Sequence, residues 1–78
     1  MNRMFYVDAL AMAERHIAQG TRIILNQRRI NAKLEDRGAD ATIANELLVA
    51  FLTSQQLHED DRRRLEIEIA KLRNEGCR

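Results

Sequence analysis

The chain has no proline, no tryptophan, three glycines and one cysteine among its 78 residues. Because proline is the strongest breaker of a helix interior, its absence permits long uninterrupted helices. The single cysteine, Cys77, excludes an intrachain disulfide. We interpret its thiol as reduced, with an intermolecular disulfide as the alternative. A chain this short, without a covalent staple, is only marginally stable through its own buried surface.

Long hydrophobic runs are also missing. The longest extends over six residues, from Leu47 to Leu52, whereas a helix that spans a bilayer needs about 20. The N-terminal segment begins like a signal peptide, but Asp8, Glu14 and Arg15 interrupt its hydrophobic region. We therefore expect a cytoplasmic protein that does not associate with membranes.

What the sequence has in quantity is charge of both signs. Charged residues make up 32% of the chain and hydrophobic residues 45%, with a net charge of +1. The hydrophobic share is too large for a disordered chain, and the balance is typical of long helices with solvated outer faces. The length suits a single domain spanning residues 1–78.

Apolar residues recur at helical spacing over two long segments on either side of Gly38. The pattern predicts one helix over about 7–37 and a second over about 41–75. Gly38 lies where a helix-ending glycine adopts the left-handed conformation, and Asp40 is placed to cap the second helix. So short a connection folds the second helix back along the first. The predicted fold is all-α, an antiparallel two-helix hairpin.

The apolar arc of each predicted helix is wider than one partner helix can cover. Beside the central strip of the first helix lies a second row at seven-residue spacing, formed by Ala11, Ala18, Leu25 and Ala32. We expect two hairpins to form a homodimeric four-helix bundle. The alternative is an unidentified protein partner on the same surface. The residues predicted to form the contact are Ala18, Leu25, Leu47, Leu48, Phe51 and Leu52.

Polar residues interrupt the apolar stripe near the middle of both helices. If facing positions sum to about 78, Asp61 lies opposite His16, and His58 lies opposite Gly20. The favoured interpretation is a polar network of His16, His58 and Asp61 that fixes the register of the helices. A metal site formed by the same three residues is the less favoured alternative. No cofactor is predicted.

Three arginines, Arg15, Arg22 and Arg29, follow one another at seven-residue spacing on the outer face of the first helix. A solvated surface, partly paired with acidic residues of the second helix, is the default interpretation of such a row. The alternative is an accessory protein that binds RNA or DNA, with the arginines following the phosphate backbone. No aromatic platform lies between the basic residues, and the net charge of the chain is small.

Catalytic arrangements are not recognisable. Ser54 is the only serine and has no base and acid beside it in the predicted hairpin, and the chain has no glycine-rich phosphate loop. The prediction is a protein that is not an enzyme and that acts through protein–protein interaction.

The chain also carries a pattern of residues spread over positions 14–65. These residues are Glu14-Arg15-His16-Ile17, Gly20, Ile24, Gln27-Arg28, Ile30, Leu34, Gly38, Asp40, Leu47-Leu48, Phe51, Gln56-Leu57-His58 and Asp61-Arg62. In this pattern the chain resembles a group of short alphaproteobacterial proteins, mainly rhizobial, that have no assigned activity. The resemblance implies a bacterial helical hairpin and no functional residues. In architecture alone, the predicted fold is also similar to the RNA-binding hairpin protein Rop, and shape by itself does not carry function.

Overall fold

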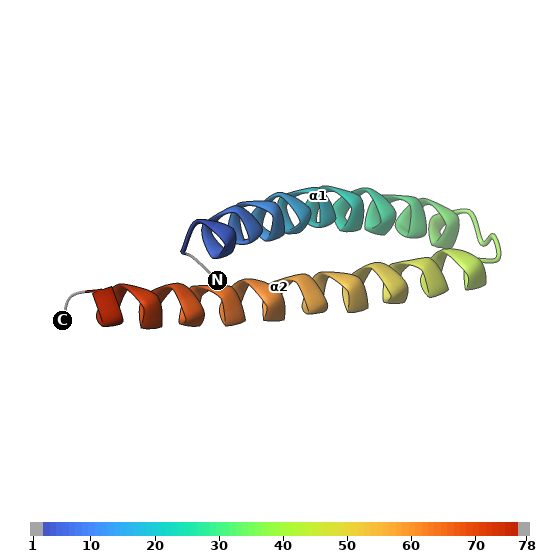
Figure 1. Ribbon diagram of the computed structural model, residues 1–78. Coiled ribbons are helices and arrows are strands. Elements are labelled where there is room, and N and C mark those ends of the chain that lie inside the picture. Colours follow the sequence, from blue (N-terminus) through green and yellow to red (C-terminus); the bar gives the residue numbers. More distant parts are fainter. Residues whose placement is uncertain (1–2, 77–78) are drawn as a thin grey trace.

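The computed structural model describes residues 3–76 and consists of two long helices that lie side by side (Figure 1). Helix α1 spans Arg3–Asp36 and helix α2 spans Thr42–Gly76. The predicted all-α antiparallel hairpin is confirmed. Helix α1 begins four residues earlier than the periodicity indicated, because no breaker precedes Val7 and the helix continues through Phe5 and Tyr6. Cys77 lies outside the described residues.

Helix α1 ends in the glycine turn that the sequence predicted. Gly38 has a φ of 67°, and its N–H donates to the carbonyl oxygen of Glu35 at 3.0 Å. The N–H of Ala39 reaches back to the carbonyl oxygen of Leu34 at 2.9 Å. This pair of bonds is a Schellman motif, which satisfies carbonyl groups that the helix end would leave without a donor. The same motif turns the chain back along α1.

Helix α2 begins with a cap from Asp40. Its Oδ1 accepts hydrogen bonds from the backbone N–H of Thr42 at 3.0 Å and from the Thr42 hydroxyl at 2.6 Å. These two hydrogen bonds stabilise the charged carboxylate and so lower the pKa of Asp40 below its usual value. The bond from the hydroxyl has the larger effect, and the bond from the N–H has the smaller one. The predicted capping role of Asp40 is confirmed, since a charged acceptor at this position satisfies a free N–H group of the first turn.

The surfaces by which α1 and α2 face each other follow an alternating spacing of three and four residues. On α1 the partly or fully buried positions that follow this spacing are Tyr6, Leu10, Ala13, Ile17, Gly20, Ile24, Gln27, Asn31 and Leu34. On α2 they are Ala44, Leu48, Phe51, Gln55, His58, Arg62, Leu65, Ile69 and Leu72. This spacing keeps one stripe of each helix against its neighbour along the whole hairpin.

Two polar residues are among the most buried in the hairpin. Asn31 is 5% exposed, and its Nδ2 donates to the carbonyl oxygen of Ala44 at 3.3 Å and to Oδ1 of Asn45 at 3.0 Å. Its own Oδ1 accepts from Nε2 of Gln27 at 3.0 Å. Because each of these buried amide groups has a partner, the layer ties α1 to α2 at one register near the turn.

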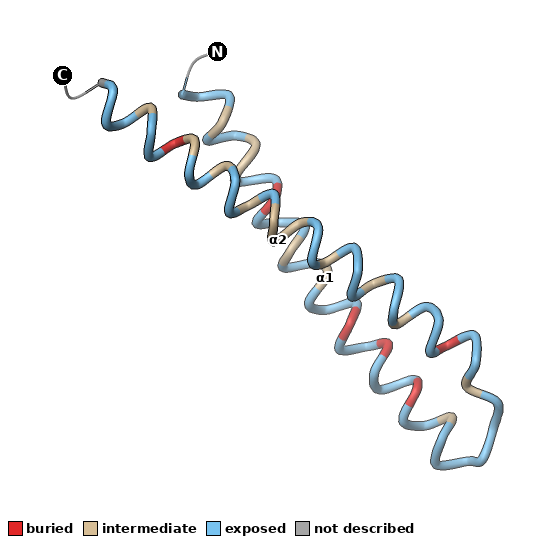
Figure 2. Tube along the Cα trace, turned by 90° about the horizontal axis from the view of Figure 1, so that it is seen from below, coloured by how far each residue is buried: buried red, intermediate tan, exposed pale blue. Residues whose placement is uncertain are grey.

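The hairpin buries little apolar surface. Among the described residues four hydrophobic side chains are buried, whereas thirteen large ones are exposed, and none is fully buried (Figure 2). The accessible surface is 6105 Å², whereas a compact monomer of 9.1 kDa exposes about 4,900 Å². The radius of gyration is 17.9 Å, against about 12 Å for a compact chain of this length. The molecule is a rod of 63 × 15 × 14 Å without a closed core.

Candidate interaction surfaces

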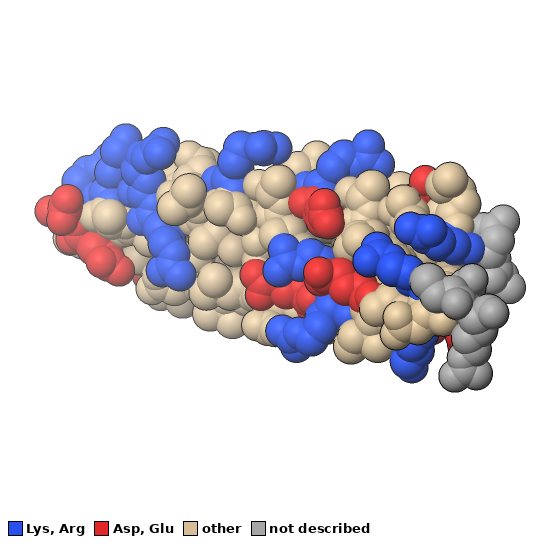
Figure 3. Space-filling model, turned by 90° about the vertical axis from the view of Figure 1, so that its left-hand side faces the viewer, with Lys and Arg blue, Asp and Glu red and all other residues tan. Residues whose placement is uncertain are grey.

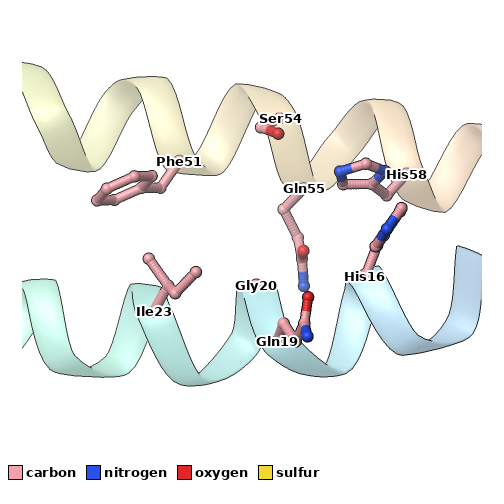
Figure 4. Close-up of a pocket in the computed structure, with 8 residues that line it drawn as sticks. All are labelled: His16, Gln19, Gly20, Ile23, Phe51, Ser54, Gln55 and His58. Atoms are coloured by element: carbon pink, nitrogen blue, oxygen red, sulfur yellow. The ribbon is translucent and has the colours of Figure 1, made fainter.

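The two histidines of the chain meet across the hairpin. The ring centroids of His16 on α1 and His58 on α2 are 5.0 Å apart, with the ring planes tilted by 53°. Both rings line a shallow groove between the helices, in which Ile23 and Phe51 also face each other (Figure 4). The structure therefore brings together two of the three residues singled out as a polar network.

Asp61 lies beside this pair without bonding to it. Its carboxylate pairs with Arg64 on the same helix at 3.1 Å, although Asp61 lines an adjoining groove with both histidines. Within residues 3–76, no three histidine, cysteine or acidic side chains are grouped so that they could hold a metal ion. The register network of His16, His58 and Asp61 stays a prediction.

The register differs from the predicted one by about one helical turn. The sequence placed His58 against Gly20, whereas the structure places His58 against His16 and Gln55 against Gly20. The cause is the Schellman motif, because the bond from Ala39 to Leu34 draws the chain back before α2 begins. Each residue of α2 therefore lies opposite a position of α1 about one turn away from the position expected in a hairpin that turns symmetrically about residue 39.

Gly20 permits the close approach of a side chain from α2. The Gln55 side chain crosses α1 at this point, and its Nε2 donates to the carbonyl oxygen of Ile17 at 2.9 Å and to the Thr21 hydroxyl at 3.1 Å. A methyl group at Gly20 would overlap the carboxamide of Gln55. Oε1 of Gln55 is buried without a hydrogen-bond partner. Glycine at this position thus leaves room for the Gln55 side chain to lie against α1.

The predicted interface residues are divided among three positions around the hairpin. Leu48 and Phe51 are partly buried on the inner stripe of α2, facing α1. Leu47 is exposed on one flank of that stripe, and Ala18, Leu25 and Leu52 are exposed on the other. Their contact with another chain stays a prediction, but the six residues do not form one continuous surface.

Two apolar faces flank the inner stripe. One, here called the isoleucine face, lies on the side of the His16–His58 groove, and its large exposed residues near the turn are Ile23, Ile30, Ile43, Leu47 and Leu57. The opposite one, here called the alanine face, continues the row Ala11, Ala18, Leu25 and Ala32 and includes Val49 and Leu52. In an antiparallel pair, residues that precede the inner positions of both helices share one side, and residues that follow them share the other.

Arg15, Arg22 and Arg29 lie on the outermost row of α1 and are all exposed. In the part of the chain that the structure describes, no acidic side chain pairs with any of the three. On the face drawn in Figure 3, a group of basic side chains lies beside a group of acidic ones at the turn end, and acidic and basic groups alternate farther along. The expected partial pairing of this arginine row with acids of α2 is thus not found among residues 3–76.

None of the helices in the described part of the chain is both long and apolar enough to cross a bilayer. Comparison of the chain with protein-family models, with curated proteins and with solved structures finds no match.

Proposed function

We propose that this chain acts through protein–protein interaction and that its main partner is a second copy, the two hairpins forming a four-helix bundle. The observation that carries the proposal is the surplus of exposed apolar side chains over buried ones. A monomeric soluble protein rarely leaves contiguous apolar surface of this extent in water, and such surface marks an association site.

The amount of surplus surface agrees with an interface. The hairpin exposes about 1,200 Å² more than a compact monomer of its mass, and a standard protein–protein contact buries about 800 Å² on each partner. The excess is therefore at least as large as the area that one partner contributes to a standard interface. Small two-helix chains gain the core that they lack by this route.

Sedimentation equilibrium over a wide range of micromolar concentrations tests the proposal. We expect a mass of twice 9.1 kDa, which falls toward one chain only on strong dilution. A single-chain mass throughout the range, with full helix content by circular dichroism, would remove self-association as the function. Chaotropic salt should weaken the dimer, while sulfate should preserve it, because apolar association strengthens in that salt.

The arginine row supports a second candidate, an accessory role in binding RNA or DNA. Arg15, Arg22 and Arg29 are exposed and have no acidic partner among the described residues, and steps of seven residues separate them by about 10 Å along the helix. Fluorescence polarisation with mixed RNA and duplex DNA in low salt is the test. Binding that weakens steeply with added salt and is lost in a triple Arg→Gln variant would support it. The absence of binding in low salt would exclude it.

A further inference from the structure

We infer that the isoleucine face in the half of the hairpin next to the turn is the surface on which the second copy is seated. The inference rests on the proposed self-association and goes beyond it, since it selects one of two candidate faces. The selected face comprises the flanking rows of α1 between His16 and Ile30, and of α2 between Ile43 and Leu57.

The isoleucine face has the larger apolar surface of the two. Five large side chains are exposed on it over these ranges, and Ile43 is the most exposed of them at 73%. On the alanine face over the same length there are three large exposed side chains, namely Leu25, Val49 and Leu52, and the rest of its row on α1 is mostly alanine. More apolar area leaves water when the isoleucine face is covered.

Its charge pattern points to a second copy as the occupant. The rows that form the isoleucine face over these ranges contain no aspartate, glutamate, lysine or arginine, whereas Arg28 lies on the alanine face. In a two-fold dimer the same patch meets itself, so a charge near the axis faces an identical charge. A face without charges avoids that repulsion.

The polar residues on this face are also compatible with self-contact. Its polar members are His16, Gln19, Asn26 and Ser54. Each of these side chains carries both a hydrogen-bond donor and an acceptor, so any of them can bond to its own copy across a two-fold axis. A face built to bind a basic or acidic partner would instead carry complementary charge.

The amount of excess accessible surface also favours a second copy as the occupant. The excess surface of about 1,200 Å² per chain exceeds what each partner contributes to a standard interface. A short peptide would cover only part of it. A second hairpin, with a helix pair of the same length, matches the rod along the apolar half.

Two matched substitutions on α2 test the inference. Leu57 on the isoleucine face is 63% exposed, and Val49 on the alanine face is 62% exposed. Replacing either by lysine adds one charge, and each new lysine has an acid three residues away, Asp60 or Glu46, so both variants retain helix support. The dissociation constant of each dimer is measured by sedimentation equilibrium, with helix content as the folding control.

We expect Leu57→Lys to weaken the dimer by about 30-fold or more, because the change places a charge where a large apolar side chain of the interface was buried. Val49→Lys should change the constant by less than about 3-fold, as at a solvent-exposed surface position. Ile43→Lys serves as a second substitution on the isoleucine face, in case Leu57→Lys fails to fold. A loss confined to Val49→Lys, or equal losses in both variants, would overturn this choice of face while self-association stood. A wild-type monomer would overturn the proposed function together with the inference.

Discussion

The half of the hairpin next to the turn and the half next to the chain ends are built in opposite ways. Near the turn, all the hydrogen bonds found between the helices join polar side chains to the opposite helix, from Asn31 and Gln55. Near the chain ends, the inner stripe is mainly apolar, with Leu10 and Ala13 on α1 and Leu65 and Ile69 on α2. The polar layers therefore lie between the turn and the middle of the rod.

The outer surfaces of the two halves also differ. The ion pairs found within residues 3–76 all lie on α2 between Asp60 and Lys71, in the half next to the chain ends. The half next to the turn instead exposes the isoleucine face. A pair of helices with polar layers between them and large apolar side chains outside resembles one layer of a larger bundle. The other half carries the ion pairs, and the large apolar side chains that it exposes lie mainly on α1. This difference is the reason for assigning the proposed association to the half near the turn.

Among the substitutions that test this difference between the two halves, Asn31→Ala is expected to have the largest effect on the free energy of unfolding. The change leaves the buried amide of Gln27 without its acceptor and removes the bonds from Asn31 to α2. We expect a loss of about 1–3 kcal/mol in the free energy of unfolding, measured by urea denaturation at fixed protein concentration because dimerisation contributes to stability.

Asn74→Ala is the matched control for that change, since Asn74 is an exposed asparagine of α2 that lies outside the isoleucine face. Its effect should stay within about 0.5 kcal/mol. Equal losses for the two variants would show that the buried amide layer does not hold the turn half together.

A smaller effect is expected from Gly20→Ala, where two terms oppose each other. Alanine favours the helix by about 1 kcal/mol over glycine, but the new methyl group displaces Gln55 and breaks its bonds to Ile17 and Thr21. In the wild-type background these terms nearly cancel. In a Gln55→Ala background, Gly20→Ala should stabilise by about 1 kcal/mol. The test is the thermal unfolding of four proteins, namely the wild type, the two single variants and the double variant. Identical effects of Gly20→Ala in both backgrounds would contradict the contact between Gly20 and Gln55.

A more modest change is expected at the turn itself. The pKa of Asp40 is lowered because the charged carboxylate accepts from the Thr42 hydroxyl and N–H. Its contribution to stability is therefore fully present above the ordinary aspartate pKa and is lost as the pH falls through the lowered value. We expect Asp40→Ala to destabilise the hairpin at neutral pH and to lose that difference in strong acid. Asp40→Asn, which keeps an acceptor, should be closer to wild type at neutral pH. A difference between Asp40→Ala and wild type that does not change with pH would contradict the role of the charge.

The smallest effect is expected among the ion pairs of the half next to the chain ends. Arg64 lies 3.1 Å from Asp61, and both side chains are more than half exposed. An exposed pair of this kind contributes less than about 1 kcal/mol, so Arg64→Ala should scarcely change the unfolding midpoint. The remaining difference should disappear in high salt, which screens exposed charges. A loss as large as that of Asn31→Ala would show that this half also depends on polar contacts.

The sequence was sufficient to predict the two helices, the glycine turn and the cap, because each follows from local rules of spacing, φ and hydrogen bonding. The predicted register was wrong by about one helical turn. The Schellman motif shifts the start of α2 relative to α1 by an amount that the spacing of apolar residues does not show. The burial of Gln27 and Asn31 was missed, since the search followed apolar residues. The signal was present, as both residues continue the three- and four-residue spacing of Ile17, Gly20 and Ile24.

The predicted interface residues lie at different positions around the hairpin for a related geometric reason. Leu47 to Leu52 forms one run in the sequence, but a helix distributes successive residues around its axis by 100° steps, so the run reaches the inner stripe and both flanks. The meeting of His16 and His58 required the register as well as the faces, and therefore came from the structure.

The most direct test of the account is a nuclear Overhauser measurement between chains, in a mixture of methyl-labelled and unlabelled protein. The account predicts contacts between chains at the methyl groups of Ile23, Ile43 and Leu57 on the isoleucine face. It predicts none at Ile67, which is 50% exposed on the outermost row of α2 in the other half. Contacts between chains that are confined to Ile67, or no contacts at all in a sample that remains folded, would contradict the claim that the turn half is where the second copy is seated.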